Sequence, residues 1–552
     1  MNKTYIYLGL IIIFAALTRL IGLEQFSPPL NRDEAAIGYN AYSLLLTGKD
    51  EHGVSWPLSF QSIGDYKMPG FIYLSLLSIK LFGLTVFATR FWSVLGGVLA
   101  VLGIYLVSFE ILKLLDFNKE KAKQIALISS VLITINPWHI HYSRLAFEAN
   151  VNLTLFIYSV WFLLKGLKQN NYLLGTAILW TGMQFIYSST FVFLPIIFVA
   201  IFLLVNKYRP FLDLNKFKIL LAVLILGLGT FFAIKTVNQV SAAKTSITIF
   251  SDPYLIDRFN HLRGEMQMNN PILAKIVYNK ISYFGPILIN NYIKNFSPGF
   301  LFANAINHPW HGIYGQGFFY FIDGLGFIFG CVYLLKMLLK KKYQFPILLI
   351  FSWLLISPLA SAITIDAPHA TRSLYLLPIF LIITGIGIFK VGEYLASKFL
   401  GQTKIVYILF ATLYLVSFIK ASYQYVVIYP YHQDKALFGG VKQAVVYADN
   451  IKQDRLVYMP EVSSSAYLYH LFYNRVDPNL VQKTAHWKGM DTAGLTHIES
   501  VGQWRFVDSL PLLNQKIIWI DRASNQGPGG YNLLAQFSNP ATGIIEWKVY
   551  EN

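Results

Sequence analysis

The sequence predicts a mainly α-helical, polytopic membrane protein with a small C-terminal α/β domain outside the membrane. Of its 552 residues, 55% are hydrophobic and only 13% are charged, and the mean hydropathy is +0.48. A soluble protein of this size carries about a quarter charged residues. Hydropathy falls after residue 421. We therefore expect a transmembrane domain over residues 1–421 and an extracytoplasmic domain over residues 422–552.

The formal net charge of +17 does not indicate nucleic-acid binding, because the basic residues cluster between hydrophobic runs, as cytoplasmic anchors do. The single Cys331 lies in an apolar run, which excludes a disulfide framework. Lys3 precedes a first apolar run without a small-residue cleavage site. This run is typical of a retained span rather than a signal peptide.

About eleven apolar runs approach the ~20 residues that a membrane span requires. They cover residues 4–23, 87–112, 122–139, 149–168, 171–187, 190–206, 217–235, 318–339, 344–362, 372–390 and 404–421. The apolar segment 68–82 reaches only about 22 Å as a helix, short of the ~30 Å hydrocarbon core. We expect it to lie on the membrane surface.

Charge bias predicts the orientation in the cell membrane. With a cytoplasmic N-terminus, the basic loops face inward, as the positive-inside rule requires. These loops lie at residues 113–123, 165–168, 207–218, 336–342 and 390–404. The outer face then receives residues 24–86, 140–148, 236–317, 363–371 and 422–552.

The outer segments contain further predicted elements. Residues 34–47 form an amphipathic pattern that Gly48 ends, so the first outer loop holds two surface helices, 34–47 and 68–82. The C-terminal domain is expected to hold helices at 433–452 and 464–474 and strands at 455–459, 516–520 and 543–549.

The acidic pair Asp33-Glu34 follows the first span at once. One interpretation is an ordinary helix cap, because the helix dipole favours an acid there. The other is a site, since acids beside a membrane are costly. A carboxylate in that place accepts a proton from a hydroxyl or amine, or holds a divalent cation. Both residues are catalytic candidates.

The same loop closes with Asp65-Tyr66-Lys67-Met68-Pro69, where Pro69 suits the first turn of the second surface helix. Lys67 is either an interfacial anchor or a point charge for a phosphate. Asp65 and Tyr66 are expected to line the same site.

Three other outer segments carry candidates. Arg144 and Glu148 are four residues apart, so they form either a helix-surface ion pair or part of a site with Asp33. Arg372 enters the tenth span on the outer side, so it needs an anionic partner, either a side chain or a lipid phosphate. Further site-lining candidates are His308, His311, Gln316 and His369, although the His308–His311 spacing matches no standard zinc motif.

In this order, the clusters resemble those of C-superfamily (GT-C) membrane glycosyltransferases that use polyprenyl-phosphate-linked sugars. Within that superfamily they are similar to the protein O-mannosyltransferase and aminoarabinose lipid A transferase group (family 39 and its relatives). The resemblance covers roughly residues 1–420. It rests on Asp33-Glu34, Lys67-Met68-Pro69, Pro137 with Ser143-Arg144 and Glu148, Pro368-x-x-x-Arg372, and the run Phe296–Gln316.

The resemblance implies that Asp33 is catalytic and that Lys67, Arg144 and Arg372 hold the donor phosphate. The lipid A transferases carry a Glu directly before the Lys, and it contributes to a metal site. Here Tyr66 takes that position, with Asp65 one residue earlier. No cofactor is therefore certain, and the candidates for a divalent metal ion are Asp33, Asp65, Glu148 and His311.

The expected reaction is an inverting transfer of one sugar from a polyprenyl phosphate to a protein, lipid or glycan acceptor at the outer membrane face. Basic side chains neutralise the leaving phosphate, and Asp33 takes the acceptor proton or orients the acceptor. The alternative is a transporter or flippase for a lipid-linked saccharide, which predicts inverted repeats and broken helices that the sequence does not display. A structural anchor for residues 422–552 is a second alternative, but it would not need the acids of 31–73.

Overall fold

The computed structural model describes the chain in eleven stretches. These are residues 3–63, 65–169, 171–208, 216–236, 247–303, 310–400, 403–432, 438–461, 465–489, 496–510 and 515–552. They form two compact units. Unit 1 comprises Met1–Arg19, Leu95–Ser143 and Glu148–Gln424, and unit 2 comprises Leu20–Val94, Arg144–Phe147 and Tyr425–Asn552.

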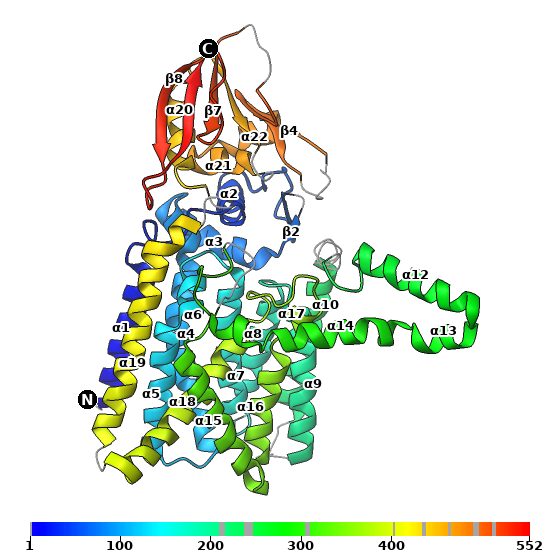
Figure 1. Cartoon of the computed structure of the whole chain (residues 1–552), viewed down its shortest axis with the longest axis vertical. Helices are drawn as coiled ribbons and strands as arrows, with labels where there is room; N and C mark the ends of the chain where they lie inside the picture. The colour runs from blue at the N-terminus through cyan, green and yellow to red at the C-terminus, as the bar shows by residue number, and fades with distance from the viewer. Residues whose placement is uncertain are drawn as a thin grey trace. The chain divides into compact units, whose positions relative to one another are not determined.

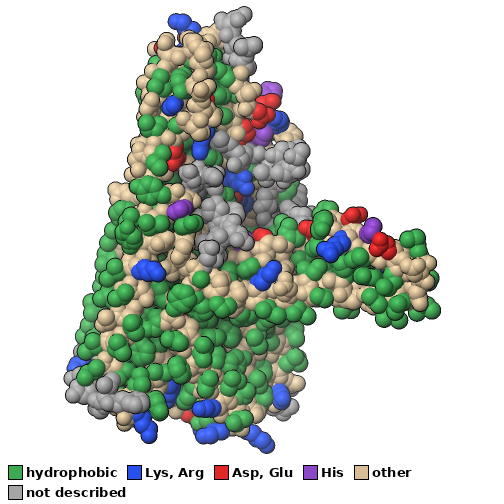
Figure 2. Space-filling model, in the orientation of Figure 1, with side chains coloured by type: hydrophobic (Ala, Val, Ile, Leu, Met, Phe, Trp, Pro, Cys, Tyr) green, Lys and Arg blue, Asp and Glu red, His purple; other side chains and the backbone are tan. Residues whose placement is uncertain are grey.

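Unit 1 is a bundle of apolar helices (Figure 1), and hydrophobic side chains dominate its visible face (Figure 2). The helices of the bundle are α1 (Lys3–Leu20), α5 (Lys119–Ile135), α6 (Pro137–Ser143), α7 (Glu148–Gly166), α8 (Asn171–Gln184), α9 (Thr190–Tyr208), α10 (Lys216–Thr236), α15 (Phe321–Leu338), α16 (Gln344–Ile356), α17 (Leu359–Ala362), α18 (Leu376–Leu395) and α19 (Thr403–Tyr423). Helix α4 (Val86–Leu114) begins in unit 2 and continues in unit 1. Short π- or 3-10 helices follow at Gly299–Ala303, Lys341–Tyr343, Ala396–Leu400, Gln424–Ile428 and Tyr429–His432.

Small residues set the packing at the centre of the bundle, where α15 lies against α18. A Cβ atom added to Gly387 would lie 1.8 Å from the carbonyl oxygen of Gly326, and one added to Gly330 would lie 2.1 Å from that of Ile383. Helices in lipid associate closely through such positions, because lipid tails supply no hydrophobic drive between them. These glycines therefore fix the distance between the two helices.

The polytopic, mainly helical fold predicted from the sequence is confirmed. Within the described ranges, nine spans are long and apolar enough to cross a membrane, or ten if the bent pair α6 and α7, which meet at 115°, is one span. Of the eleven predicted spans, α5 and α8 have only 17 and 14 residues, and α7 passes only together with α6, whereas one of the nine, Pro271–Ala303, was not predicted. Helix α5 stops before Pro137, since the residue preceding a proline avoids helical geometry.

A second difference lies in the long outer loop predicted at 236–317. It contains α12 (Pro253–Asn269), α13 (Pro271–Val277) and α14 (Lys280–Lys294), which extend from the side of the bundle (Figure 1). Each begins at a side-chain cap, from Asp252, Asn270 and Asn279 respectively. The stretch Pro271–Ala303 also passes the length and hydropathy test for a span.

Unit 2 begins with the first outer loop. The predicted helix 34–47 is α2 (Arg32–Thr47), and Gly48 ends it in the left-handed conformation, with φ of 67°. The hairpin of β1 (Phe60–Ser62) and β2 (Asp65–Lys67) leads to α3 (Pro69–Phe82), the predicted helix 68–82. Helix α3 is apolar but too short to count as a span.

The C-terminal part of unit 2 is a seven-stranded mixed sheet in the order β4-β5-β6-β3-β7-β9-β8. Its strands are β3 (Leu456–Pro460), β4 (His486–Trp487), β5 (Ile498–Val501), β6 (Trp504–Val507), β7 (Ile517–Arg522), β8 (Asn532–Ser538) and β9 (Ile545–Glu551). Its helices are α20 (Val441–Ile451), α21 (Ala466–Tyr473) and α22 (Pro478–Thr484). The three predicted strands correspond to β3, β7 and β9, and the two predicted helices to α20 and α21.

This sheet domain packs on the first outer loop within unit 2. The Tyr39 hydroxyl on α2 donates to the carbonyl oxygen of Val476 at 3.0 Å. The Gln482 amide on α22 donates to the hydroxyl of Thr47 at 3.1 Å and to the carbonyl oxygen of Asp50 at 3.0 Å. The domain boundary at 421/422 stays a prediction, but the loop and the C-terminal residues share one unit.

Candidate active site

The two acids of the Asp33-Glu34 pair lie in different environments at the start of α2. Asn31, not Asp33, is the N-cap: its Oδ1 accepts from the backbone N of Glu34 at 3.0 Å. Glu34 Oε2 in turn accepts from the backbone N of Asn31 at 3.1 Å, which completes a capping box. This first turn leaves the Asp33 side chain 47% exposed and the Glu34 side chain 2% exposed.

Glu34 is held by Arg90, at the start of α4. Arg90 Nε donates to Glu34 Oε1 and Nη2 to Oε2, both at 2.8 Å, and the guanidinium is fully buried. Arg90 also donates to the carbonyl oxygens of Leu23 and Pro28. The backbone N of Ala146 donates to Glu34 Oε1 at 2.7 Å. This bidentate pair therefore joins the starts of α2 and α4 to the segment with Leu23 and Pro28 and to Ala146.

Asp33 pairs with Lys67 instead. Lys67 Nζ donates to Asp33 Oδ1 at 2.6 Å, and the Lys67 side chain is only 8% exposed. Lys67 is the last residue of β2, opposite Phe60 of β1, and Pro69 starts α3 two residues later. The hairpin of β1 and β2 thus places the nearly buried Lys67 ammonium against the half-exposed Asp33 carboxylate.

Arg144 lies in unit 2 and contacts the segment that follows α1 in the same unit. Its Nε donates to Ser27 Oγ at 3.0 Å, Nη1 to the carbonyl oxygen of Ile21 at 2.9 Å, and Nη2 to that of Gly22 at 2.7 Å. Arg144 also lies over the Tyr425 ring, 5.7 Å from its centroid. Each guanidinium nitrogen already has an acceptor, so Arg144 orders the entrance to the first outer loop.

A buried carboxyl that the sequence analysis did not single out lies in the same unit. Glu51 is 1% exposed; its Oε1 accepts from Asn40 Nδ2 at 3.2 Å, and its backbone N donates to Asn40 Oδ1 at 3.0 Å. Burial raises the pKa of Glu51 to about 8, against the opposing effects of Asn40 and of the nearby Lys67. The sequence could have indicated this carboxyl, because Asp50-Glu51 is a second acidic pair in the polar first outer loop.

The remaining candidates of this unit lie on the hairpin. Tyr66 is half-buried on β2, and the Asp65 backbone pairs with Ser62. The Asp65 side chain lies outside the described residues.

A second cluster lies in unit 1, around Arg372. Arg372 Nη1 donates to Asp366 Oδ1, and to Thr364 Oγ1 at 2.9 Å, so its anionic partner is a side chain of the same turn. His369 Nε2 lies 3.6 Å from Asp366 Oδ2. Glu148, Asp366 and Arg372 all lie within electrostatic reach of the Tyr187 hydroxyl.

Histidines surround Thr371 in that cluster. The Thr371 hydroxyl is 3.1 Å from His311 Nδ1 and 2.8 Å from the Tyr142 hydroxyl, and the His311 and His369 rings are 4.8 Å apart. Gln316 donates to the carbonyl oxygen of its neighbour Gly317. His308 lies outside the described residues.

The metal candidates do not come together in the described part of the chain, where no three His, Cys, Asp or Glu side chains form a group that could hold an ion. Asp33 instead pairs with Lys67, and His311 with Thr371. The candidate side chains that the structure describes therefore do not form a metal site.

No protein-family model matches this sequence, and no curated protein matches it. Solved structures do match. ArnT from Cupriavidus metallidurans bound to undecaprenyl phosphate is 10% identical, with a TM-score of 0.55, covering 100% of this chain and 98% of that one. The apo form of ArnT is 9% identical, with a TM-score of 0.52, covering 99% and 98%.

The Archaeoglobus fulgidus oligosaccharyltransferase in the apo form is 12% identical, with a TM-score of 0.53 over 85% of this chain, which spans 64% of that enzyme's length. The same enzyme tethered to an acceptor peptide with the NVT sequon gives the same TM-score and identity. The expected resemblance is thus confirmed in the fold: this chain has the fold of these GT-C glycosyltransferases.

Proposed function

We propose that this protein transfers one sugar from a polyprenyl-phosphate-linked donor to a protein, lipid or glycan acceptor at the outer face of the cell membrane. The observation that carries the proposal is the Asp33–Lys67 pair, a half-exposed carboxylate 2.6 Å from a nearly buried ammonium. It lies in a fold shared with ArnT, solved with undecaprenyl phosphate, and with an oligosaccharyltransferase, solved with an acceptor peptide.

The chemistry is a single displacement. The acceptor oxygen or nitrogen attacks the anomeric carbon of the sugar, and the bond from that carbon to the phosphate oxygen breaks. Its electron pair leaves with the polyprenyl phosphate, so the anomeric configuration inverts. Asp33 orients the acceptor and takes its proton. Lys67 donates to the phosphate oxygens, where negative charge grows.

Glu34, Arg90 and Arg144 are positioning residues in this proposal. Glu34 is committed to Arg90 and to the capping box, so it fixes the first turn of α2, from which Asp33 projects. Arg144 fixes the segment that leads into that turn. For Arg372, binding to the donor phosphate stays a prediction from the family resemblance.

The direct test is turnover by the purified full-length chain. The protein is incubated with radiolabelled polyprenyl-phosphate sugars and with peptide, lipid and glycan acceptors, and released polyprenyl phosphate is measured with transferred sugar. The proposal expects both products in equal amounts from at least one donor, and neither from Asp33→Asn. Movement of an intact donor across vesicle membranes without bond cleavage would instead establish a flippase.

The outer location is tested by thiol labelling in a Cys331→Ser background. Tyr314 is 52% exposed and falls in the predicted outer loop, while Lys341 is exposed in a predicted cytoplasmic loop. An impermeant maleimide added to intact cells should label Tyr314→Cys and spare Lys341→Cys until the cells are lysed. Labelling of Lys341→Cys alone in intact cells would reverse the proposed orientation.

A further inference from the structure

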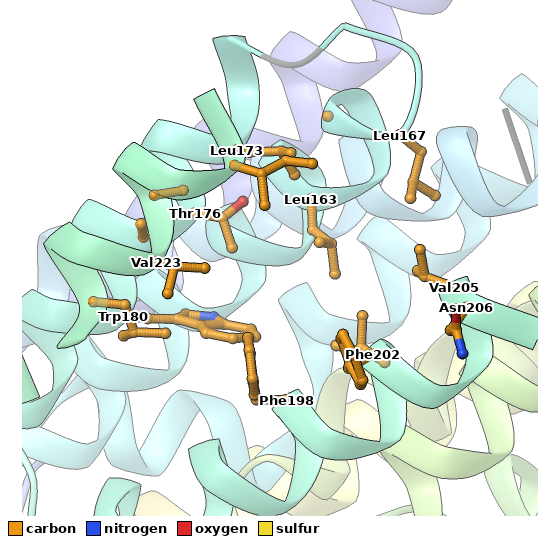
Figure 3. Close-up of a pocket in the computed structure, with 16 residues that line it drawn as sticks. Leu163, Leu167, Leu173, Thr176, Trp180, Phe198, Phe202, Val205, Asn206 and Val223 are labelled. Atoms are coloured by element: carbon orange, nitrogen blue, oxygen red, sulfur yellow. The ribbon is translucent and has the colours of Figure 1, made fainter. Parts of the chain in front are cut away.

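A hollow of about 390 Å³ opens on the side of unit 1 between α7, α8, α9 and α10 (Figure 3). This volume falls within the range of about 300–1,000 Å³ that is common for sites of small apolar ligands. Its walls are almost entirely hydrocarbon. The lining includes Leu163, Trp180, Phe198, Phe202 and Val223, and Trp180 and Phe198 lie together at one end (Figure 3).

Two of the polar side chains in the wall of this hollow, those of Trp180 and Thr176, donate into the protein. Trp180 Nε1 donates to Ser159 Oγ at 2.9 Å, and Thr176 Oγ1 donates to the carbonyl oxygen of Ser159 at 3.3 Å. Apart from Asn206, the wall therefore offers an apolar ligand dispersion contacts and leaves it no hydrogen-bond partner. Because α9 and α10 are candidate spans, the surrounding solvent is lipid hydrocarbon.

Basic residues mark one end of the hollow. Leu167, Asn206 and Ile219 line it, and each is the direct chain neighbour of a lysine, namely Lys168, Lys207 and Lys218. Lys218 Nζ donates to Asn171 Oδ1 at the start of α8, so this lysine is directed toward the α8 end of the hollow. Figure 2 shows Lys and Arg side chains gathered at the lower end of the bundle.

We propose that this hollow binds an acyl chain of an anionic phospholipid, whose phosphate lies beside Lys168, Lys207 and Lys218. Basic pockets between membrane helices on the cytoplasmic side are suited to anionic headgroups. The predicted topology places these three lysines on that side. The site is separate from the Asp33–Lys67 pair, so the proposal stands or falls independently of the transfer reaction.

The test is native mass spectrometry of the delipidated full-length protein titrated with phosphatidylglycerol or with phosphatidylcholine of the same acyl chains. The expected result is one tightly bound phosphatidylglycerol, preferred over phosphatidylcholine, and no retention of glycerol 3-phosphate. Equal affinity for the two lipids, or retention of glycerol 3-phosphate without a tail, would overturn the proposal. Displacement of phosphatidylglycerol by undecaprenyl phosphate would also overturn it, by assigning the hollow to a prenyl tail.

Two kinds of variant test the location. Ala222→Phe fills the hollow and should abolish the tight binding, while Ala411→Phe on the exposed face of α19 is the matched control. Lys207→Gln and Lys218→Gln should each weaken phosphatidylglycerol about fivefold and leave phosphatidylcholine unchanged. Lys235→Gln, at the other end of α10, is the control for charge. Unchanged phosphatidylglycerol binding in folded Ala222→Phe, or in both lysine variants, would refute the site.

Discussion

Replacing Asp33 with Asn tests the role of this carboxylate in the reaction with little effect on the stability of the fold. The change removes the negative charge of the carboxylate and so the ion pair with Lys67 at 2.6 Å, while the capping box, which depends on Asn31 and Glu34, stays intact. Because Asp33 is 47% exposed and the Asn Oδ1 can still accept from Lys67, the change leaves the ammonium with a hydrogen-bond acceptor, and we expect it to cost at most about 1 kcal/mol of folding free energy. Loss of a positioned acid or base typically costs about 10²–10⁴ in rate. We therefore expect kcat to fall by that factor with little change in Tm.

The assay pairs initial rates of sugar transfer with thermal unfolding of the same preparation. Asp508→Asn is the matched control, because it changes an exposed ion pair of unit 2, with Lys488 at 3.5 Å, that the proposed reaction does not use. Both variants should keep a wild-type Tm, and only Asp33→Asn should lose transfer. If Asp33→Asn retains the wild-type kcat, this carboxylate takes no part in the reaction and the proposed mechanism fails.

Three further predictions concern other charged residues. Arg90→Leu leaves the Glu34 carboxylate buried and unpaired, which should cost about 3–5 kcal/mol and lower Tm; an unchanged Tm would mean that the pair does not secure α2. Glu51 has its pKa raised from 4.5 to about 8, so the folded chain holds this proton more tightly than the unfolded chain; the contribution of Glu51 to stability is fully present below pH 4.5 and is lost as the pH rises through 8. Glu51→Gln should flatten that decline in a Tm series against pH, and an identical slope in the variant would contradict the assignment. Lys67→Ala and Arg372→Ala should each raise the donor KM about 10–150-fold and leave the acceptor KM unchanged, whereas an unaltered donor KM would exclude that residue from phosphate binding.

Local sequence signals predicted those elements whose ends are set by local chemistry. Helix α2 ends where Gly48 adopts positive φ, and α3 starts at Pro69, both as expected. Strands β5 and β6 were missed because each has only four residues, too few for an alternating pattern to stand out. The arm α12–α14 was missed because its polar caps look like loop residues until their backbone partners are known.

The sequence predicted which residues belong to the candidate site better than it predicted which of them pair with each other. Asp33 and Lys67 were both singled out, but their direct contact joins residues on a helix and a hairpin, which no local pattern encodes. Asp33 and Glu34 have different roles because Arg90 pairs with Glu34 and leaves Asp33 to pair with Lys67. Arg90 lies inside an apolar run, where a lone arginine already requires a buried anion. On this ground the sequence could have indicated that Arg90 pairs with an acidic residue.

Unit 2 is assembled from three stretches that are far apart in the chain: Leu20–Val94, Arg144–Phe147 and Tyr425–Asn552. During synthesis the first stretch emerges early, yet α21 and α22, on which α2 packs, are made only after most of the membrane helices. Chains generally fold from the N-terminus as they are made. The α2 surface of the nascent first loop therefore stays uncovered until α21 and α22 have been made. A truncation before α21 should leave a chain that inserts into the membrane but is recognised by quality-control proteases as unfinished, because α2 stays uncovered.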